Sequence, residues 1–324
     1  MNTVETPRVA VVGMGAFGTV HAETVRKLDG VRLAALVETD RSRHATLSQT
    51  FPGIPVYSSL EELIAAKAAD AVIIATRAST HTALATTAMK AGLAILVEKP
   101  AAETEAEIEA MIAVRNQTGA AAMVNHICLF HSLIHPLLKK VEEKGFRAAH
   151  FVRHRSALQA QRFPEAHPLR LMMVHDLYVA AQMVRGEEPV EFHFIDSGKP
   201  GHTPDMSWAT LRWADGRVAT FHAHSTLPPG SPAEGWDRTE VFGVDYHSVV
   251  QTNPAPWQWH ESLAEWPVSL EISTVHGRPV GMLAEALRSF AAAVRGAPVP
   301  CGCRLEDALQ IERWADKLIH SRKA

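Results

Sequence analysis

The sequence predicts an α/β protein with two parts, an N-terminal part built on a parallel sheet and a C-terminal part with a mainly antiparallel sheet. Three observations lead to this expectation. Short β-branched runs alternate with helical segments through the first third of the chain, and a glycine-rich turn joins the first run to the first helix. Between Phe146 and Pro267 the pattern changes towards alternation of polar and apolar residues, which is typical of half-buried strands.

Composition and charge limit the partners and the location that we expect. The chain has 324 residues, 47% hydrophobic and 21% charged, with a net charge of −3, as is ordinary for a globular protein of two domains. It has no run rich in Lys and Arg, so neither nucleic acid nor an anionic membrane is expected as its main partner. We expect no signal peptide, and no apolar run approaches the ~20 residues that span a bilayer. Three cysteines form no disulfide framework, which favours a cytoplasmic protein.

The stretch RVAVVGMGAFG, residues 8–18, carries the first functional signal. A β-branched run is followed by Gly13, Gly15 and Gly18, and a helix opens directly with Ala16 and Phe17. The first glycine permits a tight turn, the second lets the backbone approach a pyrophosphate, and the third allows close packing of helix on strand. The free N–H groups of the helix N-terminus attract phosphates. We therefore expect these five residues to bind the phosphates of a dinucleotide in a Rossmann domain.

The second apolar run, residues 31–38, ends in an acid that bears on the choice of cofactor. Glu38 stands about 20 residues after Gly18, where a carboxylate accepts hydrogen bonds from a ribose 2′-OH. A 2′-phosphate would meet like charge there, so the sequence favours NAD. Arg41 and Arg43 follow closely and keep NADP possible.

The alternation continues through the rest of the first third. Helices are expected at 16–28, 58–70, 79–92 and 103–119, and strands at 71–76, 93–100 and 121–130. Such alternation predicts a parallel, doubly wound sheet with ligands at the carboxyl ends of its strands.

The strand expected at 93–100 ends in Glu98-Lys99-Pro100, and here the chain resembles a known family. A dinucleotide fingerprint followed by EKP at a strand end is similar to the Gfo/Idh/MocA family, the glucose–fructose oxidoreductase and inositol dehydrogenase group. The family pattern also resembles four further segments, namely 75–81 (ATRASTH), 124–130 (VNHICLF) and the closing helices 285–296 and 303–321. This chain has Arg77 where the family has proline and Leu129 where the family has arginine.

The resemblance implies a domain organisation and an activity. It implies a Rossmann NAD(P)-binding domain at 1–123 and an α/β domain with a large open, mainly antiparallel sheet at 124–300. A C-terminal helix at 301–324 is expected to pack back on the Rossmann domain. The implied reaction is hydride transfer between nicotinamide and a secondary alcohol or ketone of a sugar, cyclitol or sugar derivative. The implied cofactor contacts include Thr76, His81, Glu98 and Lys99.

Lys99 is the first candidate catalytic residue. A lysine at a parallel strand's carboxyl end can hydrogen-bond a reacting hydroxyl or carbonyl, and its charge stabilises the oxygen that becomes alkoxide-like as hydride leaves. The alternative is a surface lysine paired with Glu98. Pro100 restricts Lys99 to an extended conformation, which helps to fix the direction of its side chain.

The segment 146–267 supplies the second sheet. Residues 207–227 contain two strands joined by a turn around Asp215-Gly216, a strong hairpin signal. One face of the sheet is expected to be covered by helices and the other to be free. With Trp208, Trp213 and Phe221 near it, the free face is expected to join subunits of a homodimer or homotetramer.

His175 is the second candidate catalytic residue. It lies in a helical run that begins near Pro168 and ends near Gly186. At ~100° per residue, His175 falls on a polar arc opposite the methionines and leucine of the helix. The other members of that arc are Arg170, Tyr178, Gln182 and Arg185. Asp176 falls among the apolar positions and needs a partner if it is buried.

In the family pattern His175 aligns with an acid/base histidine that has an acid one turn earlier and another three residues later. This chain has Leu171 and Tyr178 at those positions. Without the first acid, no carboxylate from that turn stabilises a charged imidazole. The residues considered for substrate contact are His126, Arg153, Arg170 and Tyr178, and Arg153 with Arg155 suits an anionic group unless both are solvated.

Alternatives to the dehydrogenase remain open at this point. Related proteins cleave glycosides through transient oxidation with the nucleotide regenerated each turnover, and a nucleotide-sensing regulator without turnover is also compatible with the altered helix motif. No metal is expected, because His131 and His135 at helical spacing have no clear third ligand and Cys301 and Cys303 have no second pair.

Overall fold

The computed structural model describes residues 6–162, 167–197, 203–228, 231, 235–251, 258–260, 263–265 and 272–322. The chain divides into two compact units. The first comprises Met1–Phe130 and Glu271–Leu309, and the second comprises His131–Leu270 and Gln310–Ala324. This division differs from the expected one in the assignment of residues 271–300 and of the helix that follows them. Residues 271–300 group with the first unit, and the helix near the C-terminus is shared, its residues from Gln310 onwards grouping with the second unit.

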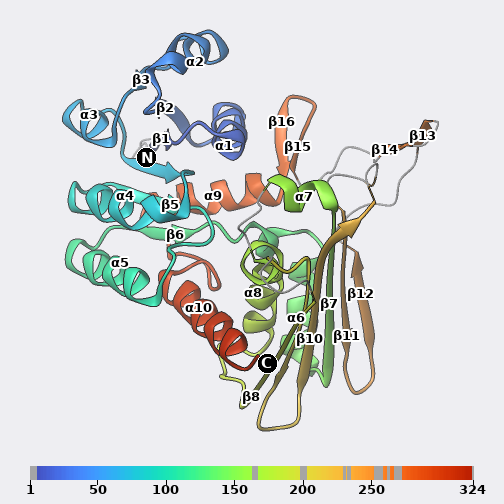
Figure 1. The fold of residues 1–324 in the computed structure, drawn as a ribbon. Coiled ribbons are helices and arrows are strands. Elements are labelled where there is room, and N and C mark those ends of the chain that lie inside the picture. The colour runs from blue at the N-terminus through green and yellow to red at the C-terminus, as the bar shows by residue number, and fades with distance from the viewer. Residues whose placement is uncertain are drawn as a thin grey trace. The chain divides into compact units, whose positions relative to one another are not determined.

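The first unit contains the predicted parallel sheet (Figure 1). Its six strands run in the order β3-β2-β1-β4-β5-β6, and all neighbouring pairs are parallel. The strands are β1 (Arg8–Val12), β2 (Arg32–Val37), β3 (Val56–Tyr57), β4 (Ala71–Ile74), β5 (Ala94–Val97) and β6 (Ala122–Val124). The strand order reverses between β1 and β4, so loops diverge there and leave space for a ligand beyond the carboxyl ends.

Helices on both faces of the sheet confirm the doubly wound pattern (Figure 1). They are α1 (Ala16–Lys27), α2 (His44–Thr50), α3 (Leu60–Ala65), α4 (Ala78–Lys90), α5 (Glu105–Thr118) and α9 (Met282–Val294), with a 3-10 turn at Arg41–Arg43. Local chemistry sets several ends. Ser59 caps α3 by accepting the Glu62 N–H, and Thr104 and Glu107 form a capping box at α5.

One expected strand is shorter than its sequence pattern. The run 121–130 is extended only over β6 and then turns into a 3-10 helix at Ile127–Phe130. The backbone N–H of His126 bonds to the carbonyl of Val124, and that of Leu129 bonds to the carbonyl of His126. These local bonds close two turns, so apolar residues that read as a strand form a compact corner instead.

The segment 282–294 groups with the first unit because its apolar face belongs to that unit's core. Leu283, Leu287 and Phe290 of α9 are buried in one hydrophobic cluster with side chains of β1, β2 and α1. Burial of apolar surface at roughly 25 cal/mol per Å² makes such a face a major contributor to stability. The core of the Rossmann sheet therefore includes residues from near the end of the sequence.

The second unit contains a six-stranded sheet in the order β12-β11-β7-β10-β9-β8 (Figure 1). Only β7 and β10 pair in parallel, so the predicted mainly antiparallel sheet is confirmed. The strands are β7 (Ala148–Ser156), β8 (Glu191–Ser197), β9 (Met206–Arg212), β10 (Val218–Leu227), β11 (Trp236–Phe242) and β12 (His247–Gln251). The predicted hairpin joins β9 to β10, and Gly216 takes the positive φ of 89° that its turn requires.

Helices of this unit cover one face of its sheet. They are α6 (Ile134–Lys144), a π-helical turn (Leu169–Met173) that continues into α8 (Val174–Met183), and the part of α10 (Leu305–His320) beyond Leu309. Trp213 and Phe221 are buried on this covered side, where Phe221 stacks on Phe151. The sequence predicts both near the free face, and the structure corrects this. Of the three aromatic residues predicted there, only Trp208 lies on the free face, as the strand alternation shows.

The remaining elements are short. They are α7 (Ala157–Arg162) and two ribbons, one of β13 (Gln258–His260) with β14 (Leu263–Glu265) and one of β15 (Ile272–Val275) with β16 (Arg278–Gly281). Among the described residues, every helix is too short or too polar to cross a bilayer.

Candidate active site

A cleft of about 960 Å³ lies at the carboxyl ends of β1, β2 and β4. Its walls include the glycine loop and the ends of β2 and β4, through Gly13, Gly15, Glu38, Arg43 and Thr76. This is the position where a doubly wound sheet binds ligands. The first unit therefore has a concave site of the right size for a large organic ligand where the sequence predicted the dinucleotide.

The glycine loop is shaped by close backbone packing. Gly13 has a φ of 89°, and a Cβ there would lie 2.6 Å from a methyl of Thr76. A Cβ on Gly18 would lie 1.9 Å from the carbonyl oxygen of Gly13. A Cβ on Gly15 would meet nothing within 4 Å, so the protein's own packing does not demand glycine there. The loop thus fits a pyrophosphate-binding turn. Gly13 and Gly18 leave no room for a side chain, and Gly15 faces open space.

The helix that follows leaves its N-terminus available to an anion. Gly15 is the N-cap of α1 and offers no side chain to the free N–H groups, and the first turn contains no acid. Ala16 and Phe17 form that turn and are both exposed. Uncompensated N–H groups and the partial positive charge of the helix end favour a phosphate at this place.

Glu38 and Arg43 share the end of β2. The Glu38 carboxylate is nearly buried and accepts the Asp40 N–H at 3.0 Å, while its other oxygen lies 2.5 Å from Nη1 of Arg43. Nη2 of Arg43 donates to the carbonyl of Met14 at 2.5 Å. In the sequence, Glu38 favours NAD and Arg43 keeps NADP possible. The structure pairs them, so the negative charge that opposes a 2′-phosphate is partly neutralised by the cation that favours one.

Lys99 follows β5, next to the largely buried carboxylate of Glu98, whose side chain is 14% exposed. Its backbone N–H donates to Oε2 of Glu98 at 3.2 Å. Burial acts to raise the pKa of Glu98, but the hydrogen bonds of His21 and Asn125 and the Lys99 charge together hold that pKa below its usual value. Glu98 is therefore an anion at neutral pH, directly beside the proposed catalytic lysine.

His126 is buried close to the same lysine. Burial, with the Lys99 charge adding to it, lowers the pKa of His126 well below its usual value, so the imidazole is neutral at physiological pH. His126 was expected to contact substrate. A neutral ring in this position can donate or accept a hydrogen bond but adds no positive charge to that of Lys99.

His81 lies between the segment that follows β4 and the segment that follows β5. Its ring is buried, with Nδ1 lying 2.9 Å from the carbonyl of Pro100 and Nε2 lying 3.3 Å from the carbonyl of Thr76. The family resemblance implies a cofactor contact for His81. Both ring nitrogens instead face backbone carbonyls, which gives the residue a direct role in holding the loop that carries Lys99.

In the second unit, His175 lies on the partly exposed side of α8. Arg170, Leu171, His175 and Gln182 are all partly exposed, at the spacing of one helical face, while the residues between them are buried. The polar arc predicted from the sequence is confirmed for His175. Tyr178, expected on the same arc, is only 4% exposed.

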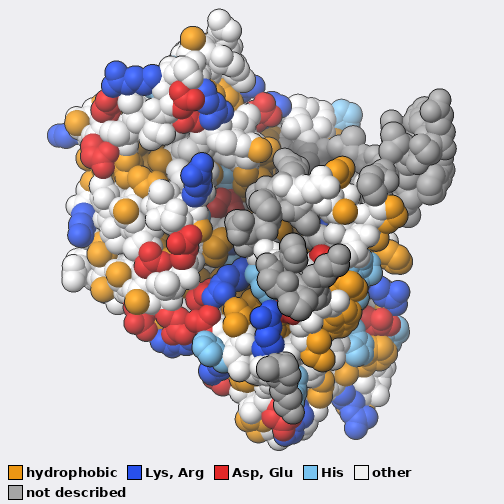
Figure 2. Space-filling model, viewed as in Figure 1, with side chains coloured by type: hydrophobic (Ala, Val, Ile, Leu, Met, Phe, Trp, Pro, Cys, Tyr) orange, Lys and Arg blue, Asp and Glu red, His pale blue; other side chains and the backbone are white. Residues whose placement is uncertain are grey.

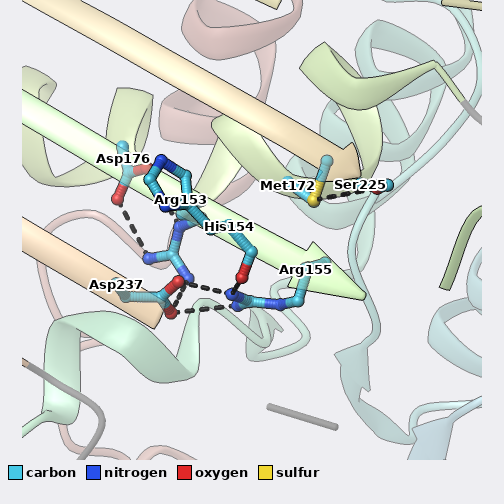
Figure 3. Close-up of polar contacts among 7 residues, drawn as sticks. All are labelled: Arg153, His154, Arg155, Met172, Asp176, Ser225 and Asp237. Atoms are coloured by element: carbon cyan, nitrogen blue, oxygen red, sulfur yellow. Dashed lines mark hydrogen bonds and ion pairs between the residues drawn. The ribbon is translucent and has the colours of Figure 1, made fainter. Parts of the chain in front are cut away.

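Asp176 has the partner that its buried position requires (Figure 3). Nε and Nη2 of Arg153 donate to its two oxygens, each at 2.9 Å, and Nη1 of Arg153 donates to Asp237 at 2.8 Å. Arg155 also bonds to Asp237, at 2.5 and 2.9 Å. Burial raises the pKa of Asp176 to about 6, against the opposing charge of Arg153. This network ties α8 to β7 and β11.

The network changes how two of the proposed substrate contacts are understood. The guanidinium of Arg153 is buried between two carboxylates, which suits a structural role better than capture of an anionic substrate. Arg170 forms ion pairs with Glu312 and Asp316 of α10, within the second unit. His175 is thus presented by a helix that is fixed on two sides by buried or half-buried ion pairs.

Sequence reasoning missed His21 and Asn125. His21 lies one helical turn after Gly18 and is completely buried, and Asn125 lies directly after β6. The burial of His21 could have been predicted, because a histidine three residues after the third glycine falls on the helix face that packs on the sheet. Its partner could not be foreseen, since the contact joins α1 to the end of β5.

Comparisons with known proteins agree with this site. Residues 7–126 match the family model described as "Oxidoreductase family, NAD-binding Rossmann fold". The chain is 28% identical over 250 residues to UDP-N-acetylglucosamine 3-dehydrogenase of Acidithiobacillus ferrooxidans, covering 75% of this chain and 73% of that protein. It is 39% identical over 94 residues to inositol 2-dehydrogenase of Corynebacterium glutamicum, covering 29% of this chain and 28% of that protein.

The fold is also similar to that of solved structures. The scyllo-inositol dehydrogenase of Lactobacillus casei, solved with NAD(H) and scyllo-inositol, aligns with a TM-score of 0.78 over 98% of this chain and 97% of that chain. The two sequences are 17% identical, so this likeness bears on the fold.

Proposed function

Because the chain belongs to the Gfo/Idh/MocA family of oxidoreductases, we propose that it is an NAD(P)-dependent dehydrogenase of a sugar, cyclitol or sugar derivative. The observation that carries the proposal is Lys99, which directly follows strand β5 and whose backbone N–H donates to the largely buried anion of Glu98. The named activities of the relatives, dehydrogenation of UDP-N-acetylglucosamine and of inositol, support an alcohol carbon of a polyhydroxylated ring as the reacting centre.

Different residues of the chain bind the cofactor and contact the reacting groups of the substrate. The glycine loop and the N-terminus of α1 hold the pyrophosphate, and Glu38 with Arg43 meets the adenosine ribose. The bound nicotinamide supplies the hydride acceptor. The Lys99 ammonium hydrogen-bonds the reacting oxygen and stabilises the negative charge that develops on it. His175 takes the hydroxyl proton in oxidation and returns it in reduction.

A substrate panel tests the proposed function. Sugars, cyclitols and nucleotide sugars are offered with NAD and with NADP, and formation of reduced nicotinamide is followed by its absorbance. We expect turnover with at least one polyol or nucleotide sugar. A purified protein that binds NAD and oxidises none of these compounds, and that reduces none of the corresponding ketones, would contradict the proposal.

We expect NAD to bind more tightly than NADP, because the Glu38 carboxylate repels a 2′-phosphate even though Arg43 partly neutralises it. Glu38→Ser removes that repulsion and releases Arg43, so it should improve NADP binding about tenfold, which corresponds to ~1.4 kcal/mol. Titration of both cofactors into the apo protein measures this. The matched variant Arg43→Ala should weaken NADP binding more than NAD binding, and tighter NADP binding by the wild type would refute the role of Glu38.

The open face of the second sheet is the proposed subunit interface, with a second copy of the chain as its partner. Ile195, Trp236 and Val249 are at least 46% exposed on this face, and Trp208 stacks on His222 there. Figure 2 shows hydrophobic and histidine side chains together over these strands. Burial, with the neighbouring histidines adding to it, lowers the pKa of His154 to about 4, so this ring is uncharged at neutral pH. The charged side chains Arg238 and Glu240 of the same face neutralise each other in an ion pair. Such a patch favours self-association.

Charges placed on this face are expected to separate the subunits. The double variant Ile195→Arg and Val249→Arg should be a monomer by light scattering, while the wild type is a dimer or tetramer. Val244→Arg is the matched control, because Val244 is 79% exposed in the turn between β11 and β12. A monomeric wild type, or a double variant that assembles normally, would refute the interface.

A further inference from the structure

Three polar side chains meet beneath Lys99 in the interior of the first unit. Glu98 at the end of β5, His21 in α1 and Asn125 after β6 converge from three elements. Nε2 of His21 lies 2.7 Å from Oε1 of Glu98, and Nδ2 of Asn125 lies 2.6 Å from the same oxygen. His21 and Asn125 are 0% and 1% exposed. The contacts therefore form a network centred on one oxygen of the Glu98 carboxylate.

The direction of each hydrogen bond follows from the chemistry of the groups. An ionised carboxylate can only accept, so Nε2 of His21 and the amide of Asn125 are both donors. Nδ1 of His21 and Oδ1 of Asn125 are buried and have no hydrogen-bond partner among the described residues. Leaving such atoms unsatisfied costs free energy. Two buried atoms are therefore left unsatisfied, at a cost in free energy of folding, while two donors point at one carboxylate oxygen of Glu98.

Those donors decide whether Glu98 stays charged. A buried carboxylate without donors takes up a proton rather than bear the loss of solvation. Here burial acts to raise the pKa of Glu98, and His21, Asn125 and the Lys99 charge reverse its effect. The second oxygen of Glu98 then accepts the backbone N–H of Lys99 at 3.2 Å. Glu98 thus acts on Lys99 in two ways. It holds the Lys99 backbone through the N–H hydrogen bond, and its negative charge attracts the Lys99 ammonium group.

We propose that His21 and Asn125 are positioning residues for Lys99, which act by keeping Glu98 an anion in a fixed orientation. The inference rests on the proposed dehydrogenase function and extends it to residues in the interior of the unit. His21 also contacts the glycine loop, because the ring of Phe17 meets its ring edge-on at 5.1 Å. The network therefore links the end of β5 that carries Lys99 to the helix turn that faces the cofactor phosphates.

The test replaces His21 in two ways. His21→Leu removes the donor and keeps an apolar side chain of similar size, whereas His21→Gln keeps an N–H donor. We expect His21→Leu to lower kcat about 10- to 100-fold, the scale of a small misplacement of a catalytic group, with NAD affinity unchanged. Because loss of the donor raises the pKa of Glu98, the rate of His21→Leu should also fall at a higher pH on the acid side than the wild-type rate does. His21→Gln should restore most of the rate and the position of that acid limb.

Val25→Ala is the matched control for damage to the helix. Val25 is buried in α1 one turn after His21, and its apolar side chain has no hydrogen-bond donor to offer to Glu98. It should lower the melting temperature without moving the pH profile. The proposal is overturned if His21→Leu keeps the wild-type kcat and acid limb, or if its rate falls only as far as its melting temperature explains and His21→Gln gives no rescue.

A second measurement separates this proposal from the dehydrogenase function. Reductive methylation with ¹³C-labelled formaldehyde marks lysine amines for NMR, and the signal missing in Lys99→Arg identifies Lys99. Its pKa should be lower in Glu98→Gln than in the wild type, because the ammonium loses its counter-charge. In His21→Leu the acid inflection of the same signal, which reports protonation of the neighbouring Glu98, should lie at a higher pH than in the wild type. An unchanged Lys99 pKa in Glu98→Gln together with an unchanged acid inflection in His21→Leu would refute the network whether or not a substrate is known. A lowered pKa in a protein without turnover would contradict only the proposed function.

Discussion

Lys99→Ala is expected to lower turnover by at least about 10²-fold while leaving NAD binding largely intact, because one donor to the developing oxyanion is lost. The backbone bond from residue 99 to Glu98 does not need the lysine side chain, so the loop should keep its shape in the variant. Steady-state kinetics on the best substrate and a cofactor titration on the same preparation measure the two quantities.

Lys90→Ala is the matched control for this variant, since Lys90 is an exposed lysine in the last turn of α4. It should turn over at the wild-type rate. If Lys99→Ala does the same, Lys99 has no part in the mechanism, and the role of Glu98 beside it must be sought in cofactor binding alone.

His175→Asn is expected to reduce turnover by about 10²- to 10⁴-fold, the usual contribution of a positioned acid/base group. Fold and cofactor affinity should be retained, because His175 is partly exposed and the helix is fixed by the ion pairs of Asp176 and Arg170. The wild-type rate of alcohol oxidation should rise with pH as the imidazole loses its proton. Leu171→Asp should move the midpoint of that rise upward, since a carboxylate one turn away stabilises the imidazolium.

Melting temperature and turnover, measured together, separate a catalytic His175 from a structural one. A structural histidine would leave His175→Asn less stable but normally active once folded. His135→Asn, at an exposed position of α6, is the matched control and should change neither quantity. A folded, NAD-binding and fully active His175→Asn would remove this residue from the reaction.

Patterns that depend on near neighbours in sequence predicted the fold well. The alternation of strands and helices, the glycine turn after β1 and the Asp215-Gly216 hairpin each depend on local spacing and turn chemistry. The position of His175 on a partly exposed face is the same kind of inference, because helical periodicity places residues without knowledge of the rest of the chain.

The parts that sequence reasoning could not supply depend on long-range register. Arg153 meets Asp176 and Asp237 only because β7 lies between β10 and β11 and beneath α8, and no spacing in the sequence encodes that order. Tyr178 shows the limit of a polar arc, since a tyrosine counted as polar is buried by its ring. His21 required knowledge that α1 packs against the end of β5.

The membership of α9 in the core of the first unit has a consequence for the protein's synthesis. Residues 1–130 leave the ribosome with the surface that Leu283, Leu287 and Phe290 later cover still open to water. At roughly 5–20 residues per second, translation of the intervening segment delays α9 by on the order of ten seconds. During that interval the nascent sheet exposes apolar surface, the condition under which chains aggregate or are bound by chaperones. The native packing of the first unit is therefore completed only after the whole of the intervening second-unit segment 131–270 has been translated.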